Sequence, residues 1–270
     1  MFDTKKLIED IDAAYDAEKP RRGSSRIGAS AVGDPCDAAI NLALRGAPEE
    51  QPSPQLKRIF KTGHWLEDQI IKDLTRAGLS IINRDALTGG QVSYTAYEDH
   101  FICRLDGLIE QEDGTVIGLE IKSMNKAKWT MFKEKGIAQS HPEYVAQCIA
   151  MMGLSGLREF VLVGYCKDNS QYHAETIPFD LFQWSFMKHR VERIMRQEDV
   201  KRIAKTPLDF RCDGCFKMGA CWGTRPVEPK CSMCVHAVPG QQRTWWCTKH
   251  DAEAKGPCAD YVKYVPADRD

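Results

Sequence analysis

Cysteines are distributed unevenly along this chain of 270 residues. Eleven are present, and seven of them fall between Cys212 and Cys258. The first residues, MFDTKKLIEDIDAAYD, are charged and amphipathic and lack the apolar segment of a secretory signal. We therefore expect a cytoplasmic protein, in a cell or in a virus-infected host. Because disulfides rarely persist in a reducing cytosol, the clustered cysteines indicate a C-terminal part that folds around metal.

The composition is that of a globular protein, with 43% hydrophobic and 28% charged residues. No run of about 18 apolar residues occurs, so we predict no membrane span. The formal net charge is −1, from 37 basic and 38 acidic side chains. A nucleic acid would therefore have to be bound by a local basic surface, because the average charge provides no attraction.

The last four cysteines form one closely spaced group: Cys231, Cys234, Cys247 and Cys258. A segment such as 226–270 is too short to fold by apolar burial alone, so we expect the four thiolates to hold a structural zinc ion, with iron–sulfur as the alternative. His236 and His250 are close enough in sequence to be alternative ligands. We expect Trp245 and Trp246 to form a stacking or docking surface on this module.

The hydrophobic periodicity predicts helices and strands in a mixed order. Helices are expected at 4–17, from about 36 to 45, and at 56–74, 125–134, 142–153 and 180–204. The last of these is expected to carry its apolar side chains inward: Phe182, Phe186, Val191, Ile194 and Met195. Strands are expected at 79–83, 91–97, 102–109, 116–123, 160–166 and 172–177. This order predicts an α/β fold with a mixed central sheet flanked by helices. We divide the chain into a domain at 1–225 and a small module at 226–270.

Two carboxylates and a lysine stand on neighbouring predicted strands, within CRLDGLIEQEDGTVIGLEIKS. Glu120 and Lys122 are one residue apart and share a face of their strand, since side chains alternate. A hairpin through Asp113-Gly114 would bring Asp106 to the same place. Paired carboxylates suit magnesium or manganese, which activates water for phosphodiester hydrolysis. The alternative is a solvated hairpin, because a Glu-x-Lys arises by chance about once in a chain this long.

Two further segments contribute polar side chains that can join this set. His64 and Glu67 lie three residues apart on the predicted 56–74 helix, hence on one face. His64 is a candidate metal ligand together with Asp106 and Glu120. An exposed polar helix face is the alternative explanation for this pair. Gln147, in the predicted 142–153 helix, is the other polar residue, but by itself it does not indicate a function.

A compact cysteine trio, Cys212-x2-Cys215-x5-Cys221, follows the last long helix. It supplies three thiolates, whereas a soft metal or a cluster normally takes four. Cys36 is a candidate for the fourth, although it can equally be a small buried apolar residue. The three remaining cysteines lie in apolar segments and are expected in the core: Cys103, Cys148 and Cys166.

Taken together, these motifs resemble the RecB-like branch of the PD-(D/E)XK nucleases, over about 30–221. The motifs in question are Gly63-His64-x2-Glu67, Asp106-Gly107, Glu120-x-Lys122 and Gln147. The cysteine pattern is similar to the iron–sulfur members of that branch, the AddB-type helicase–nucleases and the CRISPR-associated Cas-type exonucleases. That resemblance implies a 4Fe–4S cluster on Cys36, Cys212, Cys215 and Cys221, and a restriction-endonuclease-like core.

The resemblance has departures. Leu105 stands where the family has proline, Met151 replaces a frequent aromatic, and the family's histidine is often placed differently, which leaves open whether His64 or Glu67 reaches the metal. The 231–258 segment lies outside the resemblance, and no helicase motif is present. The resemblance implies a stand-alone DNA exonuclease of recombination, repair or phage DNA processing. Its expected partners are DNA and a recombination or single-strand-annealing protein.

Two basic segments are candidates for DNA contact. One is a face of the predicted 180–204 helix, with Arg190, Arg193 and Arg196, for which a solvated face is the alternative. The other is the basic loop with Arg21, Arg22 and Arg26. The competing functional hypothesis is a non-catalytic nucleic-acid-binding or regulatory protein that uses the nuclease fold and the cysteine modules for docking. The complete acidic–lysine set favours the enzyme, because a binding protein could lose any member of it.

Overall fold

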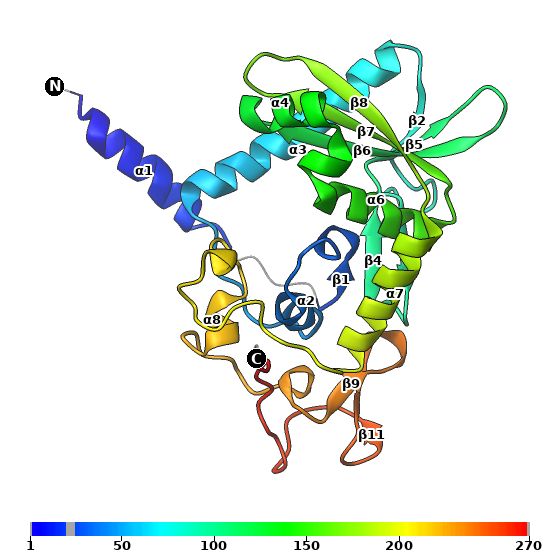
Figure 1. The fold of residues 1–270 in the computed structure, drawn as a ribbon. Helices are drawn as coiled ribbons and strands as arrows, with labels where there is room; N and C mark the ends of the chain where they lie inside the picture. Colours follow the sequence, from blue (N-terminus) through cyan, green and yellow to red (C-terminus); the bar gives the residue numbers. More distant parts are fainter. Residues whose placement is uncertain (1, 20–24, 269–270) are drawn as a thin grey trace.

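The computed structural model describes residues 2–19 and 25–268 (Figure 1). Its α-helices are α1 (Thr4–Asp16), α2 (Asp37–Leu44), α3 (Pro54–Arg76), α4 (Lys126–Lys135), α5 (Ile137–Ser140), α6 (Pro142–Ser155), α7 (Leu181–Met195) and α8 (Met218–Trp222). Its strands are β1 (Ile27–Gly28), β2 (Ser80–Ile82), β3 (Ser93–Ala96), β4 (Phe101–Arg104), β5 (Gly107–Glu110), β6 (Val116–Met124), β7 (Glu159–Cys166), β8 (Tyr172–Pro178), β9 (Ala237–Pro239), β10 (Trp245–Cys247) and β11 (Ala252–Glu253).

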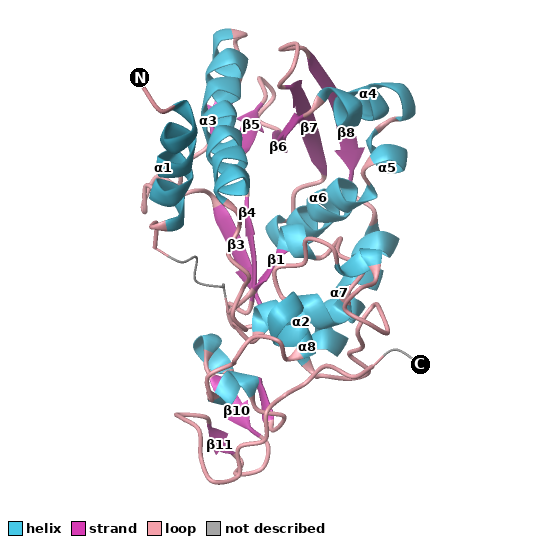
Figure 2. Cartoon of the chain, turned by 90° about the vertical axis from the view of Figure 1, so that its left-hand side faces the viewer, coloured by secondary structure: helices cyan, strands magenta, loops and turns pink. Residues whose placement is uncertain are grey.

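A five-stranded mixed sheet in the order β2-β5-β6-β7-β8 forms the centre of the molecule. Strands β6 and β7 are parallel, and the other neighbouring pairs are antiparallel. Helix α3 covers one face, where Leu66 and Ile70 pack with Leu119 and Ile121 of β6. Helices α4 and α6 lie on the opposite side, as Figures 1 and 2 show. The predicted α/β class, with a mixed sheet flanked by helices, is confirmed.

The predicted strand 102–109 is wrong, because the chain changes sheet within it. Strand β4 belongs to a second sheet in the order β1-β4-β3, whereas β5 belongs to the central one. Leu105, between them, is fully buried and donates its backbone N–H to Val92 O at 2.9 Å. The apolar residues on either side of Arg104 and Asp106 therefore belong to two different strands, and Asp106 lies at a bend between them rather than within a strand.

The last predicted helix is too long, and two of the five residues expected on its inner face are exposed, whereas Val191, Ile194 and Met195 are buried. Helix α7 ends at Met195, and the following chain turns through positive φ angles at Gln197 (62°) and Asp199 (48°). Phe182 and Phe186 were expected inside but are 89% and 73% exposed. The ring of Trp184 takes their place, since it lies where a Cβ on Gly153 would be, 2.3 Å away.

The C-terminal segment folds as a small antiparallel sheet in the order β11-β10-β9, joined by turns. It does not form a core of its own. Trp245 and Ala237 belong to the same buried cluster as Phe101, and Met233 and Tyr264 pack with residues of α2 and α8. The division of the chain at about 225 stays a prediction. No helix in the described ranges combines the length and apolar character needed to cross a membrane.

Candidate functional site

The predicted carboxylates meet where β5 separates from β6. The last paired residues of these two strands are Gly107 and Leu119. Just beyond that pair, Asp106 turns across the exposed edge of β6 and its Oδ2 accepts the backbone N–H of Ile121 at 2.8 Å. Asp106 is thereby held next to Glu120. The bend between the two sheets, and not a hairpin alone, brings the two acids together.

Glu120, Lys122 and Gln147 form a closed hydrogen-bonded triangle. Nζ of Lys122 lies 2.5 Å from Oε1 of Glu120, and the amide of Gln147 donates to the same oxygen at 2.7 Å. Lys122 also donates to Oε1 of Gln147 at 3.1 Å and lies 4.7 Å from the centre of the Tyr144 ring. Gln147 and Tyr144 both belong to α6, so this helix positions the catalytic candidates of β6.

Helix α3 approaches the same place from the other side. A Cβ on Gly63 would lie 3.8 Å from Oγ of Ser123, so α3 crosses β6 one residue beyond Lys122. The next turn carries His64, which is exposed, and Glu67, which is half-buried. An open cavity is lined by His64, Glu67, Asp68, Ile71, Asn83, Arg84, Gln91 and Asp106. Both members of the predicted pair therefore face the cavity that contains Asp106.

Electrostatics at this site favour a bound cation. Burial, followed by the charges of Glu120 and Glu67, raises the pKa of Asp106. Burial also raises the pKa of Glu67 despite His64 beside it. Oε2 of Glu120 is buried and accepts no hydrogen bond from the described residues. Carboxylate oxygens without enough positive charge around them are suitable ligands for a hard divalent cation.

Lys122 supplies positive charge at the site. Burial disfavours its ammonium form, but the charge of Glu120 and the hydrogen bond to it, with Asp106 adding to both, raise the pKa of Lys122. Lys122 therefore remains a cationic hydrogen-bond donor in this environment. Two carboxylates, Glu120 and Asp106, act on this one lysine.

The four cysteines predicted to hold a cluster line one cavity, although they come from opposite ends of the chain. They are Cys36, Cys212, Cys215 and Cys221. Cys36 is the N-cap of α2, Cys212 and Cys215 precede α8, and Cys221 lies within α8. Burial raises the pKa of the Cys36 and Cys221 thiols, and that of Cys215 to about 11. A metal centre would favour their thiolate forms by displacing the protons.

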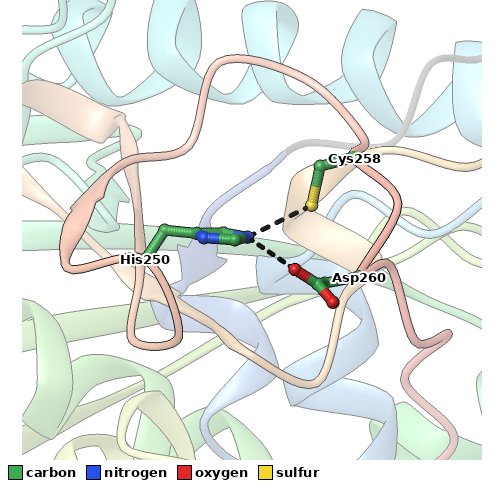
Figure 3. Close-up of side chains that lie close together, drawn as sticks. All are labelled: His250, Cys258 and Asp260. Carbon is green, nitrogen blue, oxygen red and sulfur yellow. Dashed lines mark hydrogen bonds and ion pairs between the residues drawn. The ribbon is translucent and has the colours of Figure 1, made fainter.

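The second cysteine group also converges. Cys231, Cys234, Cys247 and Cys258 line another small cavity together with His236, His250 and Asp260. Nε2 of His250 lies 3.5 Å from Sγ of Cys258 and 3.2 Å from Oδ2 of Asp260 (Figure 3). Asp260 was not predicted, because an isolated aspartate in a loop carries no signal in the sequence. Trp245 is buried, so Trp246, 39% exposed, is the only one of the predicted pair open to a partner.

The predicted DNA-contacting arginines have different environments. Arg21 and Arg22 lie outside the described residues. Arg190 and Arg193 of α7 both pair with Asp37, and Arg196 pairs with Glu198. Much of the positive charge on this helix is thus offset within the protein, and DNA contact there stays a prediction.

Arg26 belongs to a basic group that the sequence did not reveal. Burial, followed by the charge of Arg243 and then by that of Arg104, lowers the pKa of Arg26, with Asp99 opposing the shift. Arg104 and Arg243 are exposed. Arg104 ends β4 and precedes Asp106 by two residues, whereas Arg26 and Arg243 lie at the other end of that strand, where Ile27 pairs with Phe101 and Arg243 donates its backbone N–H to Glu98. The three arginines come from distant parts of the sequence and are brought to the two ends of one strand by the fold.

The geometry thus defines a mixed α/β protein with an acidic, lysine-containing site. No protein-family model matches the chain, and no curated protein matches it. Among solved structures, it is similar to an alkaline exonuclease from Laribacter hongkongensis, with 20% identity over 70% of this chain and 91% of that chain and a TM-score of 0.46. The same exonuclease in complex with dAMP gives 19% identity, the same coverages and a TM-score of 0.46. The structure titled SSO0001 gives 14% identity, coverage of 81% of this chain and 95% of that chain, and a TM-score of 0.43.

Proposed function

We propose that the protein is a divalent-metal-dependent deoxyribonuclease, an exonuclease that hydrolyses phosphodiester bonds. The observation that carries this proposal is the buried Oε2 of Glu120, unpartnered among the described residues and placed beside Asp106 and Glu67. Asp106 and Glu120 would hold magnesium or manganese, with His64 or Glu67 completing the site. When bound, such an ion supplies Lewis acidity and offsets negative charge on the scissile phosphate.

The protein's own residues have separate roles in this scheme. Lys122 presents its ammonium toward the reacting phosphate, and Gln147 holds both Lys122 and Glu120 in position. The arginines at 26, 104 and 243 would bind the DNA backbone on its way to Asp106, since phosphate contacts need local positive charge. A recombination or single-strand-annealing protein is the expected protein partner of such an enzyme.

The test is cleavage of end-labelled single- and double-stranded DNA by full-length protein, with magnesium, with manganese and with chelator. We expect cleavage only with metal. Glu120→Gln keeps the size of the side chain and should reduce the rate by about a thousandfold or more, because one member of a catalytic unit costs nearly as much as all of it. Glu110→Gln, at an exposed position on β5, is the matched control and should cleave normally. Metal-independent cleavage, or full activity of Glu120→Gln, would contradict the proposal.

The cysteine cavity at α2 and α8 completes the proposal. A 4Fe–4S cluster held by Cys36, Cys212, Cys215 and Cys221 is supported by the convergence of these four side chains on one cavity. Such a cluster would have a structural role, since it would join the N-terminal part of the fold to the segment after α7.

A further inference from the structure

The C-terminal segment carries a second set of metal-binding side chains, distant in sequence from the nuclease motifs. Its cavity is lined by Cys231, Cys234, Cys247 and Cys258, from separate turns and from β10. Among the described residues, the donor atoms of His250, Cys258 and Asp260 lie within 4.8 Å of one another. Burial raises the pKa of Cys231, which also interacts electrostatically with the other three thiols. Several thiols gathered in one cavity are typical of a site for a soft or borderline metal.

We propose that this cavity is a closed zinc site with Cys231, Cys234, Cys247 and Cys258 as ligands, and that the zinc-bound loop clasps helix α2 through Arg45. His250 is placed to hydrogen-bond the sulfur of Cys258, and Asp260 orients its ring. Such partners of metal ligands fix ligand geometry without binding the metal. Four thiolates leave no coordination position open, so the site has a structural and not a catalytic role.

Arg45 provides the link between this loop and the rest of the protein. Its side chain is fully buried, and its guanidinium donates to the carbonyl oxygens of Ser232 (2.5 Å), Cys234 (3.1 Å) and Ala237 (3.3 Å). It also lies 3.9 Å from the centre of the Tyr264 ring. Burial lowers the pKa of Arg45 to about 10. A buried cation needs such acceptors. Ser232 follows the proposed ligand Cys231, and Cys234 is itself a proposed ligand.

The end of helix α2 is therefore attached to the cysteine loop, through the Arg45 guanidinium and through the Arg45 carbonyl, which accepts a hydrogen bond from Ser232 Oγ. Arg45 is the residue that follows α2, and Cys36 caps the other end of the same helix. When zinc holds the loop, the three carbonyls keep their positions around the guanidinium. When zinc is absent, the loop can move, the guanidinium keeps Asn41 but loses the three carbonyls, and α2 should open more often.

The zinc content is tested on full-length protein by elemental analysis. We expect about one zinc per chain, and loss of most of it in Cys247→Ser as purified, because one of the four ligands is removed. Cys166→Ala removes a buried thiol from β7, far in sequence from the module, and should keep all its zinc. Full zinc content in Cys247→Ser, or iron in place of zinc at this site, would overturn the assignment.

Cobalt substitution distinguishes the ligands from their neighbours. At saturating cobalt, the thiolate-to-cobalt absorbance per bound cobalt should fall by about a quarter in Cys258→Ser, since one of four thiolates is lost, and should keep its intensity in His250→Gln. The reverse result, with His250→Gln losing the metal and Cys258→Ser unchanged, would show that His250 is the ligand.

The clasp is tested by amide hydrogen exchange over 37–45. We expect exchange at least about tenfold faster in zinc-stripped protein than in loaded protein, with recovery on adding Zn²⁺ but not Mg²⁺. If Cys247→Ser does not fold, wild-type protein stripped by a chelator, with its iron content measured in parallel, provides the same comparison. Unchanged exchange of these amides after zinc removal would refute the clasp.

Discussion

Glu120 has an environment that an ordinary structural carboxylate would avoid. Its side chain is 2% exposed, and only Oε1 is bound by neighbouring donors, Lys122 and Gln147. Burying a charged group with incomplete compensation costs several kcal/mol, in the range of about 2–7 for a polar group left without a hydrogen bond. Sites that retain such a cost usually do so for function, because the strain is relieved when a ligand binds.

Asp106 is likewise a buried carboxylate close to other acids, so Asp106→Asn should change the stability of the protein. This change removes a negative charge that burial and two neighbouring acids disfavour, and it keeps an oxygen for the backbone N–H of Ile121. We expect metal-free Asp106→Asn to melt about 2–4 °C above metal-free wild type, which corresponds to about 1 kcal/mol. DNA cleavage should be lost. Thermal denaturation in chelator, paired with the cleavage assay, measures both effects.

Magnesium provides the internal control for that variant. It should raise the melting temperature of the wild type and have little effect on Asp106→Asn, because binding to the native state stabilises only a protein with an intact site. Equal stabilisation of both proteins by magnesium would show that Asp106 is not a ligand.

At this scale the sequence was informative about some residues and silent about others. Asp106, Glu120 and Lys122 could be proposed from strand alternation, and the structure does bring them together. Gln147 carries no signal by itself, since its role depends on α6 lying against β6. Arg104 and Arg243 could not be distinguished from ordinary surface arginines, because their proximity to Arg26 arises from the tertiary fold.

Among the elements, those with clear periodicity were predicted well. Strands β6, β7 and β8 and helices α3 and α6 lie close to their expected ranges. The failures occur where tertiary contacts decide the outcome. Strands β4 and β5 are nearly contiguous in sequence but belong to different sheets. The polar segment after Met195 ends the helix, because its backbone adopts positive φ angles at Gln197 and Asp199. Periodicity does not report on which sheet a strand joins.

We predict that Arg104, at the end of β4, and Arg243, in the loop before β10, contact DNA. The double variant Arg104→Ala/Arg243→Ala should bind DNA more weakly and should reduce the slope of log affinity against log salt by about 1.8, from two lost phosphate contacts. Fluorescence anisotropy with labelled DNA at several salt concentrations, in calcium or without metal to prevent cleavage, measures this slope.

Helix α7 supplies the comparison for that experiment. Arg190 binds Asp37 and the carbonyl oxygens of Val32 and Asp34, so Arg190→Ala should mainly lower stability, by about 1–3 kcal/mol. A full change of salt slope in Arg190→Ala, with none in the double variant, would move the DNA contact from β4 to α7.

For the molecule as a whole, the two cysteine cavities are joined by α2 and by the apolar cluster that contains Leu42, Ala220 and Met233. The sequence allowed the cysteines to be grouped by spacing, and each group lines one cavity in the structure. The sharing of a core between the C-terminal segment and α2 was not predictable, because it depends on contacts between the two ends of the chain.

The cluster proposal leads to a prediction for Cys36→Ser. This variant should lose most of its iron and the visible absorbance of the anaerobically purified protein. Its free energy of unfolding should fall by about 4 kcal/mol, on the order of what a crosslink closing a long loop contributes. Iron and sulfide analysis with chemical denaturation provides the measurement, and Cys166→Ala is the matched cysteine control.

Full iron content and unchanged stability in Cys36→Ser would show that Cys36 is an ordinary half-buried cysteine of the α2 cap. The fourth ligand would then have to come from elsewhere in the chain.

The carbonyl oxygens that bind Arg45 also affect how the protein folds while it is being synthesised. The guanidinium is bound by Ser232, which lies 187 residues further along the chain. A ribosome releases the N-terminal part first, and domains generally fold as they emerge. Helix α2 can complete its contacts only late, because Arg45 finds Asn41 within the helix but its three carbonyl partners, in Ser232, Cys234 and Ala237, are translated much later. A ribosome that stalls before Ser232 would therefore release a protein in which the Arg45 guanidinium lacks these three acceptors.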